Sequence, residues 1–589
     1  MVCHAIITKR GKNMTLRELR KSKGLTQKEA GKLLSMSTRN YQFYEADEAE
    51  RKSTLQYHRI YKALENYKET VSIRKKDFHL NIKLKEDLEK LTESVKDFQK
   101  RECFSSVMEY LTGSQKGKVM ILYGLRRTGK TTILFQAIRE LPLRDSCYIK
   151  IQSKDSMKDL VQDLEELSRL GIRYVFIDEI TLMEDFISTA GILSDIYSTL
   201  PMKIILSGTD SLGFSFACQN ELYDRAINIH TSYIPFKEYE RLLGIHNLDT
   251  YIEYGGTLKK ENINFSDSDY KKEEIAFYDD ESTRKYIDTA ISKNIQHALK
   301  TDPDSHHLSK LKELYEQNEL TNVINRIVED MNHDFLLSVI DRKFKSHDLG
   351  SSKNLLLHEA PQRKAYALYD INTEEVLQRM KGILEIKEKN ERNVSIDENV
   401  LLQIKEYLFQ LDLIAKAEIR YDKGNPEERY LFLQPGMRYS ICKALVYSLM
   451  KDSYFQSLSI EERTDIKNKI LSDVKGKMLE DIILYETKAS LGPSYEVFQY
   501  RFLSGGEFDM VVSDTENLVS YLFEIKHSNK IVKNQAKNLL DAKKTEIVQY
   551  RYGKIKKKYI LYKGNDDRMD DIDYVNIEEY LKDVRKYVQ

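Results

Sequence analysis

A glycine-rich loop within residues 119–132 carries the side chains best suited to chemistry. The loop, Gly124-Leu-Arg-Arg-Thr-Gly129-Lys130-Thr131, fits the phosphate-binding pattern G-x-x-x-x-G-K-[ST], with an apolar run before it and a helical pattern after it. Its glycines allow backbone N–H groups to face phosphate oxygens, while Lys130 would reach the β- and γ-phosphates and Thr131 would bind Mg²⁺. The pattern therefore predicts ATP and Mg²⁺ as cofactors. The expected nucleotide contacts are Gly124, Arg127, Thr128, Gly129, Lys130, Thr131 and Thr132.

Two further apolar runs also end in polar groups. The run 174–179 ends in Asp178 and Glu179, and the run 203–209 ends in Thr209. Asp178 is placed to hold Mg²⁺, Glu179 to orient or deprotonate the attacking water, and Thr209 to lie near the γ-phosphate. Buried strands that alternate with helical patterns predict a parallel α/β sheet with its ligand at the carboxyl edge. We therefore expect an ATP-hydrolysing domain over residues 91–240.

A second group of reactive side chains lies near the end of the chain. One predicted strand contains Asp509, and the returning strand contains Glu524 and Lys526. Strand alternation places Glu524 and Lys526 on one face, with Phe523 and Ile525 on the other. Two carboxylates can hold a divalent metal that activates water, and a lysine can orient the water or offset charge in the transition state. This arrangement suits metal-dependent phosphodiester cleavage, and the basic cluster 554–558 offers local positive charge for a phosphate backbone.

Length and composition set limits on these interpretations. The 589 residues suggest about four domains. Because 93 Lys and Arg balance 93 Asp and Glu, any nucleic-acid-binding surface must be local. The five cysteines are scattered without a C-x-x-C pair, which argues against a zinc site or a disulfide framework. Since the sequence shows neither an apolar signal core nor a membrane-length apolar run, we expect a soluble cytoplasmic protein with no membrane partner.

Residues 14–67 predict a small all-helical domain. The apolar residues that recur at helical spacing are Leu16, Leu19, Leu25, Ala30, Leu33, Leu34, Tyr41, Tyr44, Leu55, Ile60 and Leu64. The arrangement resembles the XRE (Cro-like) helix-turn-helix family in its Leu25-Thr-Gln27 start, its 33–37 turn and its Tyr44-Glu45 end. The resemblance implies double-stranded DNA as a partner, read by a recognition helix in the major groove. It assigns DNA contacts to Gln27, Thr38, Arg39, Asn40 and Gln42. A protein-protein adaptor is the alternative role for this module.

The remaining segments are assigned from their patterns. Dense mixed charge predicts a linker over 68–90, and helical spacing predicts a helical lid over 241–370 that contains a polar insertion at 262–282. Over 371–440, two amphipathic helices precede a strand pair joined by a turn at 422–427, which predicts a winged helix serving as a structural spacer. Residues 441–589 form the last predicted domain.

Several short blocks outside the N-terminal domain resemble an AAA-like, STAND-related ATPase family of bacteria and archaea. These blocks are the doubled arginine of the loop, the stretch 234–239, the glycine pair at 255–256 and the stretch 431–438. The resemblance covers most of residues 90–589 and is weak between 257 and 371. It implies a C-terminal restriction-endonuclease-like domain and, since such ATPases frequently assemble, a possible homo-oligomer. Arg225 precedes the block at 234–239 and is either an arginine finger toward the phosphates or an ordinary surface arginine.

The C-terminal group itself resembles the PD-(D/E)xK nuclease fold. Asp509 followed by Glu524-x-Lys526 matches the fold's motif, although no proline precedes Asp509. The resemblance implies that Glu480, on the preceding helix, is the first metal-binding acid beside Asp509 and Glu524, and that Gln535 lies on the following helix. A folded but inactive domain remains the alternative.

Together these features predict a multidomain α/β protein that binds DNA and couples ATP binding or hydrolysis to metal-dependent nucleic-acid cleavage. The combination of domains suits defence or the control of mobile elements. One alternative is a transcriptional regulator switched by ATP, with an inactive nuclease-like domain. A third is a signalling ATPase whose N-terminal module binds protein.

Overall fold

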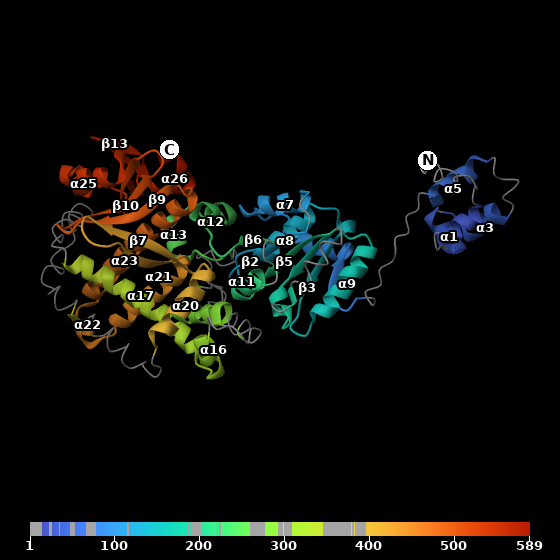
Figure 1. The fold of residues 1–589 in the computed structure, drawn as a ribbon, viewed down its shortest axis with the longest axis horizontal. Coiled ribbons are helices and arrows are strands. Elements are labelled where there is room, and N and C mark those ends of the chain that lie inside the picture. The colour runs from blue at the N-terminus through green and yellow to red at the C-terminus, as the bar shows by residue number, and fades with distance from the viewer. Residues whose placement is uncertain are drawn as a thin grey trace, which may run out of the picture. The chain divides into compact units, whose positions relative to one another are not determined.

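The computed structural model divides into two compact units, residues 1–78 and 79–589 (Figure 1). The residues that it describes are 15–22, 26–34, 36–46, 54–65, 78–114, 117–186, 189–190, 202–220, 222, 225–258, 277, 279–292, 299, 309–345, 378–379, 382 and 396–588. Within these ranges, no helix is both long enough and apolar enough to cross a membrane.

The N-terminal unit contains four described helices around one small core. They are α1 (Leu16–Ser22), α2 (Gln27–Leu33), α3 (Thr38–Ala46) and α5 (Leu55–Glu65). The prediction of Leu55 as a core residue is wrong, because Leu55 is 72% exposed, whereas Tyr57, two residues later, is buried. A buried ion pair, with Arg20 Nη2 2.9 Å from Glu45 Oε1, joins α1 to α3. The buried apolar side chains are Leu16, Leu19, Ala30, Tyr41, Tyr57, Ile60 and Leu64.

A six-stranded sheet forms the first part of the larger unit. Its order is β1-β3-β4-β5-β2-β6, from β1 (Ile82–Leu84), β2 (Val119–Tyr123), β3 (Ser146–Lys150), β4 (Tyr174–Asp178), β5 (Lys203–Gly208) and β6 (Ala226–His230). All neighbours are parallel except β1 and β3. The helices of this part are α6 (Glu86–Glu93), α7 (Phe104–Thr112), α8 (Lys130–Arg139), α9 (Met157–Arg169) and α11 (Ser211–Asn220). The predicted parallel α/β architecture is therefore confirmed here.

The structure corrects the expected linker over residues 68–90. Residues 68–77 lie outside the described residues, but β1 and the start of α6 fall within the proposed linker. Strand β1 pairs with β3, with Ile82 opposite Ile149, and Leu88 of α6 is fully buried against α8. Among the described residues of this segment, Glu86, Glu89 and Lys90 are exposed, so their charges concealed the packed side formed by Ile82 and Leu88.

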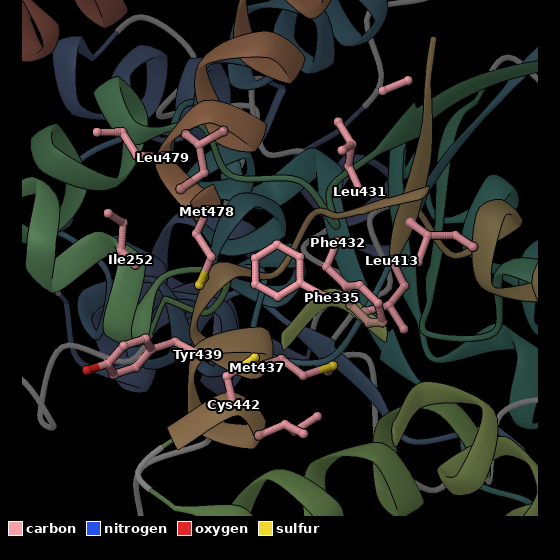
Figure 2. Close-up of a cluster of buried hydrophobic side chains, with 14 of the residues drawn as sticks. Ile252, Phe335, Leu413, Leu431, Phe432, Met437, Tyr439, Cys442, Met478 and Leu479 are labelled. Atoms are coloured by element: carbon pink, nitrogen blue, oxygen red, sulfur yellow. The ribbon is translucent and has the colours of Figure 1, made fainter. Parts of the chain in front are cut away.

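The region expected to form a lid is helical where it is described. It contains α12 (Phe236–Leu243), α13 (Leu248–Tyr254), α14 (Asp280–Ile287), the π-helical stretch η6 (Asp288–Ser292), α16 (Ser309–Glu316) and α17 (Leu320–Lys345). Most of the expected insertion, 262–276 and 278, lies outside the described residues. These helices share one core with the C-terminal part of the chain. Figure 2 shows this shared core, where Ile252 of α13 and Phe335 of α17 lie among side chains from residues 413–479.

An eight-stranded sheet organises the C-terminal part. Its order is β13-β14-β12-β11-β10-β9-β7-β8. The strands are β7 (Ile414–Tyr421), β8 (Glu427–Phe432), β9 (Tyr495–Arg501), β10 (Glu507–Asp514), β11 (Val519–Ile525), β12 (Lys554–Tyr562), β13 (Asp567–Met569) and β14 (Ile572–Asn576). The helices are α20 (Glu398–Gln410), α21 (Pro435–Leu449), α22 (Ser453–Ser457), α23 (Ile460–Ser490), α24 (Lys537–Leu540), α25 (Ala542–Tyr552), α26 (Ile577–Lys582) and α27 (Arg585–Val588), with 3₁₀ turn η8 (Lys533–Ala536).

The prediction of a separate winged helix over 371–440 is wrong. The predicted hairpin exists as β7 and β8, but β7 also pairs in parallel with β9, with Ile419 opposite Gln499. The hairpin is therefore the edge of the C-terminal sheet. The first amphipathic helix expected there, 373–386, lies almost entirely outside the described residues.

A buried carboxyl joins the end of α23 to the start of α12. The backbone N–H of Phe236 donates to Glu486 Oε1 at 2.7 Å, and Glu486 is only 3% exposed. Burial raises the pKa of Glu486 to about 7, more than the opposing hydrogen bond from Phe236 lowers it. Because the pKa in the folded state exceeds the unfolded value of 4.5, folding loses stability as the pH rises from about 4.5 through 7.

We predict that Glu486→Gln removes this pH dependence. At pH 8 the variant should gain on the order of 3 kcal/mol in the free energy of unfolding over the wild type, and at pH 4.5 it should gain none. Urea unfolding of both proteins at the two pH values measures the difference. An equal gain or loss at both pH values would contradict the assignment of a buried, ionising Glu486.

Candidate functional site

The glycine-rich loop connects the end of β2 to the start of α8. Gly124 and Gly129 have φ values of 142° and 88°, which side chains other than glycine rarely adopt. A Cβ atom on Gly124 would also lie 2.7 Å from Thr231 Oγ1. Lys130 begins α8, and its Nζ donates to the carbonyl oxygens of Gly124 and Leu125 at 2.8 Å each. Burial lowers the pKa of Lys130 to about 8.

A hydroxyl and a carboxylate meet beside Lys130. Thr131 Oγ1 donates to Asp178 Oδ2 at 2.9 Å, and Asp178 is the last residue of β4. The hydroxyl of Tyr148, from the neighbouring strand β3, donates to the same oxygen at 2.9 Å. Burial and the nearby Asp178 charge raise the pKa of Tyr148, so its proton stays in this contact. Thr131 and Asp178 thus offer the hard oxygen ligands that suit Mg²⁺.

Glu179 follows Asp178 in a strained backbone conformation. Its φ of 59° lies in the left-handed region, which is uncommon outside glycine and is often found at functional sites. Thr209 Oγ1, at the end of β5, donates to Glu179 Oε2 at 3.4 Å. Burial and the neighbouring Asp178 raise the pKa of Glu179. A carboxyl group with a raised pKa at this edge is suited to accept a proton from water.

The buried side chain of Arg101 binds the backbone of the phosphate-binding loop. The sequence did not predict this role. It is 7% exposed, and its Nη1 donates to the carbonyl oxygens of Thr128 and Thr231 at 2.8 Å each. Its guanidinium also forms an ion pair with Glu238, with Nη2 2.8 Å from Oε2. Thr128 Oγ1 in turn donates to Leu125 O at 2.8 Å. No sequence signal marks Arg101, because its partners lie up to 137 residues away.

The remaining predicted nucleotide contacts differ in their positions. Arg127 is exposed within the loop and has a left-handed φ of 65°, while Thr132 is half-buried in the first turn of α8. Arg225 lies at the other edge of the sheet. Its carbonyl accepts from Val119 N at the start of β2, and β6 runs parallel to β2 from there.

This register argues against Arg225 as a contact within one chain. The five residues of β2 place the start of the strand about 16 Å from the loop that follows its end, which exceeds the length of an arginine side chain. The structure therefore does not bring Arg225 to the phosphate-binding loop of its own chain, and within one chain the alternative of an ordinary surface arginine is favoured.

The C-terminal group comes together as predicted. In the pairing of β10 with β11, Met510 lies opposite Phe523, so the next pair along the two strands is Asp509 and Glu524. Lys526 Nζ lies 3.0 Å from Asp509 Oδ2 and 2.6 Å from Glu524 Oε2. Ile525 N also donates to Asp509 Oδ2 at 2.8 Å. Alternation along β11 is confirmed, because Phe523 and Ile525 join the large core while Leu522 joins the core on the other face.

The charged side chains of this group shift each other's pKa values. Burial raises the pKa of Glu524 to about 8, because this effect outweighs the lowering by the Lys526 charge, and the charge of Asp509 raises the pKa further. Burial lowers the pKa of Lys526, but the charges of Asp509 and Glu524 outweigh that effect and raise it. Lys526 is therefore a cation held between two carboxyl groups at the strand end.

The outer members of the group are only partly as predicted. Glu480 lies on α23 within electrostatic range of Lys526, and its Oε2 accepts from Lys477 at 2.6 Å. Gln535 instead bonds locally, with its Oε1 accepting from Val532 N and its Nε2 donating to Ser528. Gln535 lies in the 3₁₀ turn η8, and it is Asn538 on α24 that reaches the acidic group, because its Nδ2 donates to Glu524 Oε1 at 3.3 Å. Across the described part of the chain, no group of three or more His, Cys, Asp or Glu side chains is arranged to hold a metal.

The predicted DNA contacts lie on the helices of the N-terminal unit. Arg39, Asn40 and Gln42 are exposed on α3, whereas Thr38 is half-buried at its start. Ser37 accepts from Asn40 N at 3.2 Å, as a residue capping the N-terminus of α3 would. Gln42 Nε2 donates to Gln27 Oε1 at 2.9 Å. Gln27 thus links α2 and α3.

Comparisons with known proteins support part of this description. Residues 116–240 match the family model of the AAA domain. An uncharacterized protein of Methanocaldococcus jannaschii is 27% identical over 180 residues, which is 29% of this chain and 39% of that protein. The chain therefore spans well under half the length of this curated relative.

Two solved structures show weaker similarity. The Aeropyrum pernix ORC1 protein in complex with DNA is 12% identical, with a TM-score of 0.22, covering 63% of this chain and 94% of that one. The S. cerevisiae Hsp104–ADP complex is 14% identical, with a TM-score of 0.23, covering 79% of this chain and 66% of that one. TM-scores this low do not establish a shared fold. The family match and the loop geometry together identify residues 116–240 as an AAA-like nucleotide-binding domain.

Proposed function

We propose that this chain binds and hydrolyses ATP at the carboxyl edge of the six-stranded sheet. The observation that carries the proposal is the contact of Thr131 with Asp178 beside the buried Lys130, with Glu179 next in the chain. Lys130 would exchange its contacts with Gly124 and Leu125 for phosphate oxygens, and Glu179 would accept the proton of the attacking water, positioned with Thr209. Thr131 and Asp178 would hold Mg²⁺, which supplies charge stabilisation for the transferred phosphate. Release of phosphate from ATP by the purified chain tests the proposal, and release no greater than that of Lys130→Ala would contradict it.

The C-terminal site supports a second activity, the cleavage of phosphodiester bonds. Asp509 and Glu524 converge on one cation, Lys526, so the same two carboxylates would suit a divalent metal completed by water. Glu480 remains the third acid that the nuclease resemblance implies. Such a metal would supply an activated water. Lys526 would then orient that water or offset the charge of the scissile phosphate, and Asn538 would hold Glu524 in place.

The N-terminal unit is proposed to bind double-stranded DNA. The exposed side chains of Arg39, Asn40 and Gln42 on one short helix suit contacts to base edges. We expect Arg39→Ala to weaken binding to a preferred duplex by about 1–3 kcal/mol, since a good base contact contributes that much. ATP turnover should be unchanged, because the site of hydrolysis lies in the other unit.

The matched control is Arg59→Ala, which removes an exposed arginine from α5 of the same unit. Fluorescence anisotropy with a labelled duplex selected for binding measures both affinities. Equal affinity of Arg39→Ala and Arg59→Ala for that duplex would reject the assignment of α3 as the reading helix.

The whole chain is therefore proposed to couple ATP to nucleic-acid cleavage at a DNA site, in defence or in the control of mobile elements. The alternative is an ATP-switched regulator whose C-terminal site is inactive. Two observations favour that alternative: Lys526 already forms ion pairs with both carboxyl groups, and the described residues contain no cluster of three metal-binding side chains. Cleavage assays with Mg²⁺ or Mn²⁺ separate the two.

A further inference from the structure

The short helix α13 lies between the two candidate sites: the chain that follows it contacts the phosphate-binding loop, and its first turn contacts the segment that contains Lys526. Asn247 caps its first turn by accepting from Asp249 N at 2.8 Å, and Gly255 ends it by donating to Tyr251 O at 2.8 Å. Its seven residues span about 10 Å. Tyr251 and Ile252 are fully buried, and Tyr251 donates from its hydroxyl to Ile234 O at 2.7 Å. A capped helix packed in this way moves as one piece.

The C-terminal end of α13 leads directly to the phosphate-binding loop. Leu258 N donates to Arg127 O at 2.8 Å, inside the loop. A Cβ atom on Gly129 would lie 3.3 Å from Leu258 Cδ1, so the Leu258 side chain also packs beside the residue that precedes Lys130. Any rearrangement of the backbone at Arg127 or Gly129 must therefore displace Leu258 or break this contact.

The glycine pair between α13 and Leu258 is also fixed from outside. Gly255 O accepts from Gly436 N at 3.0 Å, and a Cβ atom on Gly256 would lie 1.9 Å from Gln434 Oε1. Gln434 Nε2 in turn donates to Ser232 O at 2.8 Å, and Ser232 Oγ accepts from Leu125 N in the loop. The end of α13 is thus connected to the loop by two sets of contacts, one through Leu258 and the other through Gln434 and Ser232.

The N-terminal end of α13 holds the residue that follows Lys526. Asp249 Oδ1 lies 2.6 Å from His527 Nε2, and Asp249 Oδ2 accepts from Lys563 Nζ. The hydrogen bond with His527, aided by Lys563, keeps the pKa of Asp249 well below its usual value, so this carboxylate stays ionised. Backbone bonds already join this strand end to β12, from Lys526 N to Leu561 O and from Lys563 N to Ser528 O. Asp249 therefore binds side chains from both strands that carry the Lys526 segment.

We propose that α13 couples the two sites: occupation of the phosphate-binding loop shifts Leu258 and α13, and Asp249 passes that shift through His527 to Lys526. Lys526 is the cation between Asp509 and Glu524, so its position sets whether those carboxylates are closed to a metal. Asp249 and His527 act here as positioning residues, not as catalytic ones. This inference rests on the proposed binding of ATP by the loop, but it does not require that the C-terminal site cut nucleic acid.

Hydrogen exchange at the Lys526 segment tests the coupling without an activity assay. Amide exchange is followed by mass spectrometry in peptides covering residues 524–530, with and without a non-hydrolysable ATP analogue and Mg²⁺. In the wild type we expect the analogue to change the exchange rate by about fivefold or more, the lower end of usual coupling between sites. In Asp249→Asn the same peptides should exchange at one rate in both conditions.

The matched control is Glu253→Gln, which neutralises another carboxylate of α13 whose partner is Lys475 on α23. It should keep the wild-type response. His527→Gln breaks the same contact from the other side, so it keeps the test valid if Asp249→Asn does not fold. An unchanged rate in the wild type at saturating analogue, or a full response in both Asp249→Asn and His527→Gln, would overturn the proposed link.

Binding of a fluorescent ATP analogue, measured beside the exchange experiment, distinguishes a failure of ATP binding at the loop from a failure of the link through α13. Binding without an exchange response rejects only the link through α13. Absence of binding to the wild type rejects the proposed function of the loop and the link with it.

Discussion

Glu179→Gln is expected to lower the rate constant for ATP hydrolysis by about 10²–10⁴-fold, the usual contribution of a general base. The amide keeps the size of the side chain and can still accept from Thr209, but it cannot take a proton from water. Because Lys130, Thr131 and Asp178 are untouched, the affinity for ATP should stay close to that of the wild type. Steady-state phosphate release and titration with a fluorescent ATP analogue measure the two quantities.

Two further variants make this prediction specific. Lys130→Ala should lose both binding and hydrolysis, because it removes the ammonium group expected at the β- and γ-phosphates. Glu184→Gln should behave like the wild type, since Glu184 is an exposed carboxylate shortly after the same strand. If Glu179→Gln turned over ATP as fast as Glu184→Gln, Glu179 would not be the base.

Asp509→Asn is expected to reduce metal-dependent cleavage at least about 100-fold, as is typical when one group that stabilises the transition state is removed. Asp509 is 2% exposed, and its Oδ2 accepts from both Lys526 and Ile525 N. Asparagine retains one acceptor oxygen, so the strand end keeps its hydrogen bond while the negative charge that attracts a metal is lost. Gel assays with plasmid and linear duplex, in Mg²⁺ or Mn²⁺, measure the loss.

Two further variants test that result: Lys526→Ala changes a second residue of the site, and Glu546→Gln is the control. Lys526→Ala should also lose cleavage, whereas Glu546→Gln, an exposed change on α25, should not. Thermal unfolding of each variant separates loss of chemistry from loss of fold, since Lys526→Ala leaves two carboxyl groups without their shared cation. Cleavage by Asp509→Asn at the rate of Glu546→Gln would show that any nuclease activity resides elsewhere.

The sequence predicted correctly those features that depend on the spacing of a few neighbouring residues. The glycine-rich loop, Asp178 at the end of its strand, and the alternation that places Glu524 beside Lys526 each depend on a few neighbouring residues, and the structure has all of them in place. The position of Arg225 could also have been predicted in this way. It directly precedes a parallel strand, and such a residue lies at the amino edge of the sheet, away from the ligand.

The parts that were missed depend on contacts between distant residues. Strand β7 joins the C-terminal sheet through a parallel partner that lies 80 residues later, as Ile419 faces Gln499. A helix-and-hairpin pattern is compatible with either a separate winged helix or the edge of a larger sheet, and only that pairing decides between them. Arg101 and Tyr148 were likewise invisible, because a buried arginine and a strand tyrosine acquire their roles only from Thr128, Thr231 and Asp178.

We propose that ATP at the loop controls nucleic-acid cleavage at the C-terminal site. The most direct test is the rate at which the purified 589-residue chain cleaves plasmid and linear duplex with Mg²⁺ or Mn²⁺, measured with and without ATP. We expect cleavage whose rate depends on ATP and which is lost in Asp509→Asn. Cleavage at one rate regardless of ATP would contradict the coupling, and no cleavage by a chain that binds DNA and hydrolyses ATP would favour the ATP-switched regulator instead.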